Sequence, residues 1–581
     1  MAAAPGKQLT PAQSSPSGSQ APWLCETQLP FGDGAFQLMN VFSAAIVLGN
    51  YLLHSEIFLL TAGVMDHWCR RPDSFANLSV DEWKQLAIPV DKNGEYSHCT
   101  IREPPDGGTE ARVVRCTSWE YDYTKYGNNI VSAWNLVCDR LWLIDFARIV
   151  YAAASVIPLA ASASFADSIG RRTALFIVIP VVLISAVASA MPNDLQFFMI
   201  VRAVVSASTS VLVPPAITLV TDASTIDKFP AYVVAVSLLS FILMPVTVLA
   251  AHLARTGWVA VQVILMIPTC LLMLLYYTVI ESPIWLLATG HVKEAERVAL
   301  CAAKMNNVSA DVCHELMARQ IADLRARGWQ TAESSGLCSG RLRTRTVLMC
   351  CMSTALCFGF DTFVTKDGIP TGDVAASLSF ALSAVACVAT IPFVKQFGLR
   401  NAVVGSALGF AVTLTALAGT TYGGGGQTLN DSLVVPMKAA GNVCFTFFLV
   451  MGLKSLPVVS RCSGAAAMLA ASRFGDTLGQ LTPRLINDQS IAMRLAISGA
   501  LTSLFAIGAE LLPCDFDYWM QQHLSHQRCP RHPSPEGTKR AMRDTLVPLP
   551  KEPVQHRPIT TKDRVALRRS TTQATGEQCA V

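Results

Sequence analysis

The stretch SFADSIGRRTALFIVIP, Ser164–Pro180, places an acid, a glycine and two arginines between two long apolar runs. Ionised side chains are costly inside the hydrocarbon of a bilayer, whereas at its surface they can pair with one another and with helix ends. Gly170 permits a turn that a Cβ atom would strain. Asp167, Arg171 and Arg172 therefore predict a charged turn at a membrane surface that holds helix bundles together. A plain positively charged anchor is the alternative.

The composition of the whole chain supports a membrane protein. Of 581 residues, 51% are hydrophobic and 15% are charged, against about 25% charged in ordinary soluble domains. The mean hydropathy is +0.39. Residues 1–37 hold no apolar run of the kind that a signal peptide needs. We therefore expect the first span, at 38–62, to act as the targeting signal.

Twelve apolar runs are long enough to span a bilayer, for which about 20 residues suffice. They lie at roughly 38–62, 144–166, 173–192, 196–219, 230–253, 258–280, 345–364, 373–396, 400–420, 433–453, 463–485 and 491–512. The predicted fold is therefore an all-α membrane protein with twelve transmembrane helices in two six-helix halves.

Lys and Arg concentrate in the loops on one side of these runs, which marks that side as cytoplasmic. This predicts cytoplasmic tails at 1–37 and 513–581, an extracellular loop at 63–143, spans two to six within 144–280, a central cytoplasmic loop at 281–344, and spans seven to twelve within 345–512.

The predicted extracellular loop carries four cysteines, Cys69, Cys99, Cys116 and Cys138. Four cysteines outside the cell suggest two disulfides, with three possible pairings. Asn77-Leu78-Ser79 is a glycosylation sequon on the same side. The remaining cysteines lack the spacing of metal ligands, so we expect no metal site and no cofactor.

Several motifs carry a resemblance to a known family. SFADSIGRR is similar to the signature between the second and third helices of the major facilitator superfamily, and ESPIWLLATGHVKEAERV, which begins at Glu281, resembles the motif after its sixth helix. CTSWEYDYTKYGNNIVSAWNLVCDRLWL, 116–143, resembles the end of the outer loop in the organic ion transporter family, solute carrier family 22. His54, DHWC at 66–69, RIVYAAASV in the second span and LPVVSRCSG at 456–464 fit the same pattern. The resemblance covers about residues 38–512.

The second half departs from that pattern. The mirror of the charged turn is KQFGLRN, 395–401, with only Arg400 where a pair of arginines is usual. Lys454 stands where the family commonly has an acid, so a pair between Arg461 and an acid there would lose its partner. The resemblance assigns gating roles to Asp167, Gly170, Arg171, Arg172, Glu281 and Arg461. The departures predict a gate that is weaker or differently connected.

Ionisable residues inside spans are candidate site residues, because they are expensive there. They are His54 and Glu56 in the first span, Arg202 in the fourth, Asp361 in the seventh, and Arg473 with Asp476 in the eleventh. Arg473 lies near the middle of its run and must have an anionic partner or face a watery cavity. Guanidinium matches a carboxylate in a bidentate way, so Arg473 predicts substrate contact. A structural pair with Asp476, three residues on, is the alternative.

In the resembling family the position of Arg473 tends to be Arg in transporters of organic anions and of carnitine-like zwitterions, and Asp in cation transporters. Phe358 and Phe445 are expected to enclose a ring of the substrate, and His54 and Glu56 complete the predicted site. Arg202 is expected to be structural.

The sequence therefore predicts a transporter of organic anions or carboxylate-bearing zwitterions in the plasma membrane, working by alternating access as a uniporter or exchanger. No phosphate-binding loop or catalytic constellation is visible, so we expect no enzyme. The expected partners are a small organic ion, membrane lipid and possible counter-ions, with no nucleic acid. One alternative is a cation transporter with Glu56 and Asp361 as the charge site. The other is a non-transporting relative whose outer loop binds a partner protein.

Overall fold

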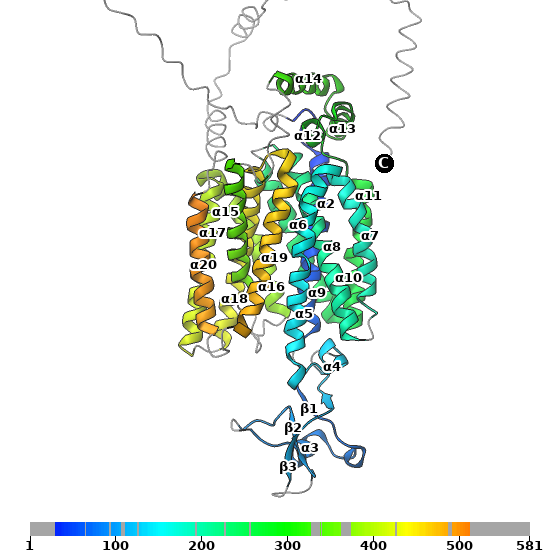
Figure 1. Cartoon of the computed structure of the whole chain (residues 1–581), viewed down its shortest axis with the longest axis vertical. Coiled ribbons are helices and arrows are strands. Elements are labelled where there is room, and N and C mark those ends of the chain that lie inside the picture. Colours follow the sequence, from blue (N-terminus) through cyan, green and yellow to red (C-terminus); the bar gives the residue numbers. More distant parts are fainter. Residues whose placement is uncertain are drawn as a thin grey trace, which may run out of the picture.

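The computed structural model describes residues 29–511, apart from gaps at 64, 92–93, 106–110, 125–126, 192–193, 226–227, 255–256, 327–336, 338–339, 362–372, 425–426 and 486–490. The described helices form two bundles side by side (Figure 1). A small domain of short strands projects from one end of the first bundle, and three short helices lie at the opposite end.

The first bundle contains the six spans predicted for the first half. Its helices are α2 (Ala35–Thr61), α5 (Trp142–Ala154) continued by α6 (Val156–Ile169), α7 (Arg171–Ala188), α8 (Leu195–Asp222), α9 (Phe229–Ala254), and α10 (Trp258–Cys270) continued through a 3-10 turn by α11 (Leu275–Thr278). At 1.5 Å per residue, α2 is about 40 Å long, enough to cross a hydrocarbon layer of about 30 Å.

The second bundle repeats this plan. Its helices are α15 (Gly340–Asp361), α16 (Asp373–Phe397), α17 (Leu399–Tyr422), α18 (Gln427–Lys454), α19 (Arg461–Leu485) and α20 (Ile491–Leu511). Ten spans in the described part of the chain are long and apolar enough to cross a membrane by composition. The other two, α15 and α19, carry arginines at one end or at mid-length. The predicted all-α architecture of twelve spans is confirmed.

The two bundles share one core of apolar side chains. Helix α19 of the second half packs against α5, α6 and α8 of the first, and α9 packs against α16 and α18. The halves therefore meet along these helices.

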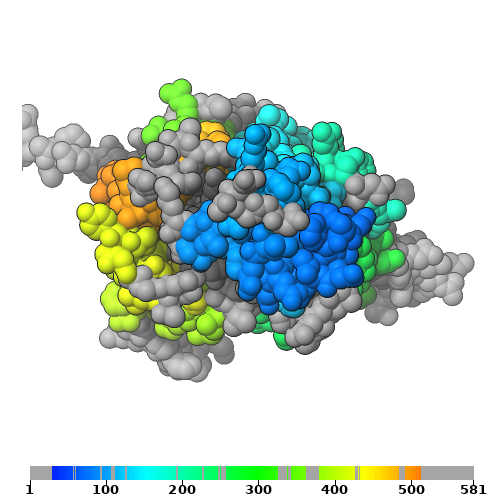
Figure 2. Space-filling model, turned by 90° about the horizontal axis from the view of Figure 1, so that it is seen from below, coloured from blue at the N-terminus to red at the C-terminus, as the bar shows by residue number. Residues whose placement is uncertain are grey.

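The projecting domain is the predicted outer loop. Strand β1 (His67–Cys69) pairs with β4 (Trp119–Tyr121), and β2 (Thr100–Glu103) pairs with β3 (Arg112–Arg115), both antiparallel. Two short helices complete it, α3 (Val80–Ala87) and α4 (Ile130–Trp134). Seen from this end, the blue loop domain lies in front of the first half, and the yellow and orange helices of the second half are visible to its left (Figure 2).

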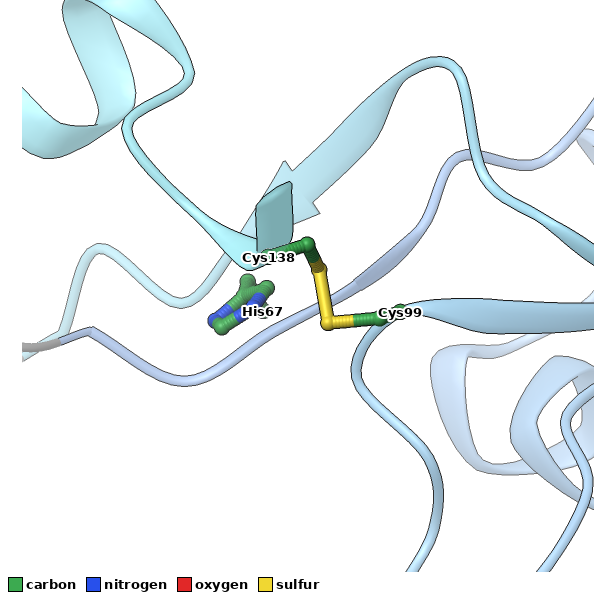
Figure 3. A group of neighbouring side chains, drawn as sticks. All are labelled: His67, Cys99 and Cys138. Atoms are coloured by element: carbon green, nitrogen blue, oxygen red, sulfur yellow. A yellow bond between two sulfur atoms is a disulfide. The ribbon is translucent and has the colours of Figure 1, made fainter. Parts of the chain in front are cut away.

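Two disulfides join the strands of this domain, Cys69–Cys116 and Cys99–Cys138. The structure thus selects one of the three pairings that the sequence left open. His67 lies beside the second disulfide (Figure 3). The sulfurs of Cys99 and Cys138 are bonded to each other, so they are not available as thiolate ligands. We therefore interpret the group of His67, Cys99 and Cys138 as a disulfide with a neighbouring histidine. Asn77 is exposed just before α3, as the sequon requires.

Three helices cover the other end of the first bundle: α12 (Pro283–Ala288), α13 (Val292–Met305) and α14 (Ala310–Ala326). Phe31, which precedes α2, and Phe36, in the first turn of α2, pack on them. Asn306 holds both residues in place, since its Oδ1 accepts from the Phe36 N–H at 2.9 Å and its Nδ2 donates to the Phe31 carbonyl at 2.9 Å.

Candidate substrate site and charge cluster

A cavity lies between the two halves. Its volume is about 190 Å³. Its walls come from α2 and α5 of the first half and from α15, α16, α18 and α19 of the second. The lining residues are Tyr51, Leu52, Ser55, Glu56, Phe58, Arg148, Tyr151, Ala152, Cys357, Phe360, Ser379, Phe380, Lys438, Asn442, Phe445, Ser472, Arg473, Asp476 and Gln480. A cavity between facing halves is where transporters of this architecture bind their substrates.

The cavity lies between mid-bundle and the end that carries the loop domain. Arg473 is twelve residues into α19, about 18 Å from its start. Glu56 is close to the end of α2, and Arg148 is close to the start of α5, both at the loop-domain end. Arg473 is thus the deepest of these three charges.

Arg473 is 5% exposed and already has several partners. Its Nη1 lies 3.3 Å from Asp476 Oδ2, and both Nη atoms donate to Ser55 Oγ at 3.3 Å. The guanidinium also lies over the ring of Tyr51, 4.4 Å from its centroid. The structural pair with Asp476, which the sequence offered as the alternative, is present. Substrate contact by Arg473 stays a prediction.

The cavity places two further cations that the sequence analysis missed, Arg148 and Lys438. Both lie inside apolar runs, so the rule that flagged Arg473 as expensive would have found them. Glu56 lines the same cavity, as predicted for a site residue. Neither Glu56 nor Arg148 has an ion pair within the described residues.

Two predicted site residues do not line the cavity. His54 is fully buried behind it, with Nε2 3.1 Å from Thr269 Oγ1 in α10. Phe358 is replaced in the lining by Phe360, two residues on, because a shift of two residues turns a helical side chain by about 200°. Phe445 lines the cavity, together with Phe380. The side chain of Asp361 lies outside the described residues.

Arg202 is buried in the first half, as expected for a structural residue. Its Nη2 donates to the carbonyl oxygen of His54, and its guanidinium lies 4.6 Å from the ring centroid of Tyr151. It therefore ties α8 to α2 and α5 behind the cavity wall.

At the end away from the loop domain, the charged turn meets the second half. Asp167 pairs with Arg171 at 3.1 Å and accepts the backbone N–H of Ser463 from α19 at 2.7 Å. Arg171 Nη2 donates to the carbonyl of Val458, also in the second half, at 2.7 Å. The predicted contact between bundles is thus present.

The expected loss of a partner for Arg461 is wrong. Arg461 Nη1 lies 2.5 Å from Asp222 at the end of α8, in the first half, and both side chains are fully buried. The other oxygen of Asp222 lies 3.8 Å from Arg171 Nε. Lys454 reaches the same place, with Nζ 3.4 Å from the Thr221 carbonyl and 4.7 Å from the Phe229 ring centroid. Asp222 of the first half therefore pairs with Arg171 of its own half and with Arg461 of the second half.

Glu281 completes this charge cluster, which we define as Asp167, Arg171, Asp222, Glu281 and Arg461. Its carboxylate accepts the backbone N–H groups of Arg171 and Arg172, each at 3.0 Å, and so caps α7. Burial raises the pKa of Glu281 and outweighs the lowering effect of these N–H groups and of Arg171.

Comparison with known proteins identifies the family to which this architecture belongs. The family model of the sugar (and other) transporters matches residues 146–459. The chain belongs to the sugar (and other) transporter family. The structure is similar to that of the proton:xylose symporter XylE, with a TM-score of 0.54 and 17% sequence identity over 80% of this chain and 94% of that one. A partially occluded inward-open XylE from E. coli gives a TM-score of 0.51 at 16% identity, over 82% and 100%. These confirm the major facilitator fold and a multi-pass membrane protein.

Curated relatives include members of solute carrier family 22, which the sequence motifs resemble. The Beta-alanine transporter of Drosophila melanogaster is 24% identical over 44% of this chain and 46% of its own length. Solute carrier family 22 member 7 of Homo sapiens is 27% identical over 55% and 62%. Member 6 of Rattus norvegicus is 26% identical over 47% and 52%. The chain thus spans less than two thirds of these relatives' lengths. The relatives are transporters, not enzymes.

Proposed function

We propose that this chain is an alternating-access transporter of small organic ions at the plasma membrane, and that its substrate carries a carboxylate. The observation that carries the proposal is the charge of the cavity. Its lining holds three cations, Arg148, Lys438 and Arg473, against two acids, Glu56 and Asp476. A net positive wall between two rocking halves favours a small organic anion or a zwitterion.

The contacts at the two ends support a direction of opening. Pairs of Asp222 with Arg461 and of Asp167 with the Ser463 N–H join the halves at the end predicted to be cytoplasmic. The cavity lies towards the other end. Substrate therefore enters from outside in this conformation, and rocking of the halves breaks the charge cluster to release it inside.

The name of one relative is consistent with this substrate class. β-Alanine, named for the Drosophila relative, is a carboxylate-bearing zwitterion. The proposed mechanism is uniport, or exchange with a counter-ion, through this same cavity. The exposed Asn77 is proposed to carry a glycan on the outer loop.

A cation transporter is the second candidate, and Glu56 favours it, since this carboxylate lines the cavity with no ion pair within the described residues. The non-transporting alternative rested on Lys454 and on the reduced second-half turn, and the pairing of Asp222 with Arg461 weakens the part of it that concerns Arg461.

The test is uptake by cells expressing wild type and Arg473→Ala at matched surface levels. The panel is one aromatic monocarboxylate, one carnitine-like zwitterion and one organic cation. We expect wild type to accumulate the carboxylate or the zwitterion, and Arg473→Ala to lose this uptake. Uptake of the cation alone, unharmed by Arg473→Ala, identifies the second candidate. Background flux for all three, with protein at the surface, overturns transport of these classes.

A further inference from the structure

The three cations of the cavity differ in how their charges are used. Arg473 is 5% exposed and is held by Asp476, Ser55 and the Tyr51 ring. Its charge is balanced by Asp476, and both its Nη groups already donate to acceptors. Arg148 is half-buried in the cavity wall and has no ion pair among the residues that the structure describes. An unbalanced guanidinium in a low-dielectric wall attracts an anion far more strongly than a paired one.

Arg148 is presented from a fixed surface. Arg148, Tyr151 and Ala152 all line the cavity, and their spacing of three and four residues places them on one face of α5. Behind that face, Ser206 Oγ donates to the Tyr151 carbonyl at 2.6 Å, and the Arg202 guanidinium packs on the Tyr151 ring. These contacts tie α5 to α8. A binding group on a helix held this way has a defined position.

Arg148 also lies where an incoming substrate passes. It is six residues from the start of α5, at the end of the bundle that carries the loop domain, and Arg473 lies deeper. The other end is closed by the charge cluster. An anion that enters this cavity therefore meets Arg148 before it reaches Arg473.

We propose that Arg148 is the specificity-determining residue that binds the substrate's carboxylate, and that Arg473 is a positioning residue which holds α19 to α2. This inference rests on the proposed function. Guanidinium offers two parallel donors to a carboxylate, so the contact is bidentate and selects a planar anion. Arg473 keeps its contacts with Ser55 and Asp476 while the substrate is bound.

The test is saturable uptake of the carboxylate substrate by wild type, Arg148→Gln, Arg148→Lys and Arg473→Ala at equal surface levels. Arg343→Gln is the matched control, since Arg343 is exposed at the start of α15 and lies outside the cavity. We expect Arg148→Gln to raise KM by about ten- to a hundredfold with a smaller change in kcat, the range for loss of a charged hydrogen-bond pair. Arg148→Lys retains the positive charge but loses the two parallel donors of the guanidinium, so its KM is expected to lie between those of wild type and Arg148→Gln.

Arg473→Ala is expected to lower kcat, because it removes the side chain that positions α19 against α2. A second measurement restores the charge chemically. Arg148→Cys is treated with a cationic or an anionic methanethiosulfonate reagent, with wild type, which keeps Cys357 in the same cavity, treated in parallel. We expect the cationic reagent to recover carboxylate uptake and the anionic reagent to suppress it.

The two proposals fail in different ways. If wild type moves no carboxylate, the proposed function falls and this assignment falls with it. If wild type moves the carboxylate but Arg148→Gln keeps the wild-type KM, or both reagents act alike on Arg148→Cys, the assignment to Arg148 is overturned while the function stands.

Discussion

The turn between α6 and α7 and the turn between α16 and α17 occupy equivalent places in the two halves and have the same backbone. Gly170 has φ of 102° and ψ of 152°, and Gly398 has φ of 90° and ψ of 164°. This region of backbone angles is essentially restricted to glycine. Each glycine ends one spanning helix and immediately precedes the next.

The side chains around these glycines differ. Asp167 and Arg171 of the first turn are nearly or fully buried and contact the second half. Their equivalents in the second turn are Lys395 and Leu399. Arg400, the equivalent of Arg172, lies 3.8 Å from Glu510 of its own half, on the surface. The first turn therefore contacts the opposite half through its charged side chains, whereas the ion pair of the second turn stays within its own half.

The ends of two long helices show the same difference. Helices α8 and α18 each have 28 residues, and they end in Asp222 and Lys454 respectively. Asp222 contacts an arginine from each half, whereas Lys454 adds another cation beside them. The backbone plan is repeated, but the two acids that contact the opposite half at this end, Asp222 and Asp167, both come from the first half.

Asp222→Asn is expected to have the largest effect. It leaves Arg171 and Arg461 buried without this carboxylate, which costs about 3–5 kcal/mol in the free energy of unfolding. The mirror change, Glu510→Gln, removes an exposed and distant partner and should cost less than about 1 kcal/mol. Thermal unfolding of the purified variants measures both, and equal shifts would break the comparison.

Gly170→Ala ranks second. A Cβ here meets Glu281 Oε2 at 2.5 Å, in addition to the backbone strain. We expect destabilisation of roughly 1–3 kcal/mol from strain, plus displacement of the Glu281 cap. Gly398→Ala is the reference variant, because Gly398 has a similar backbone strain at φ 90°. Unfolding temperatures of the two variants test this, and a larger loss for Gly398→Ala would contradict it.

Lys454→Glu tests whether the missing acid matters for rate. It places a carboxylate where Arg461 already donates to the Leu453 carbonyl at 3.1 Å. We expect a stronger contact between the halves and hence a lower kcat, by roughly two- to tenfold, with KM unchanged. Lys454→Met is the control for removal of the cation. A faster transporter with glutamate would refute the closing role of this cluster.

The smallest expected effect is a dependence on pH. Because the folded pKa of Glu281 is raised by burial, its stabilising contribution is complete below the unfolded pKa near 4.5 and is lost as pH rises through the folded pKa. As pH rises from 4 towards 7, the unfolding temperature of wild type should therefore fall relative to that of Glu281→Gln. A difference that is flat in pH would show that the titration of Glu281 is not linked to folding.

A single rule, that charge inside an apolar run is costly, led from the sequence to several charged residues that line the cavity. It identified Arg473 and Glu56, and it would have reached Arg148 and Lys438 if applied to every run. The sequence also predicted His54 and Phe358 as site residues, and neither lines the cavity, because a helical face is settled by small rotations that the pattern of a wholly apolar helix does not reveal.

The sequence by itself determined the twelve spans, the loop with two disulfides and the charged turn at Asp167 and Arg171, since hydrophobicity, spacing and glycine act locally along the chain. Only the tertiary structure decided which cysteines pair and that Arg461 takes its acid from Asp222, 239 residues away. A charge pairs with whichever opposite charge packing brings near it, because Coulomb attraction depends on distance in space and not on position in the chain.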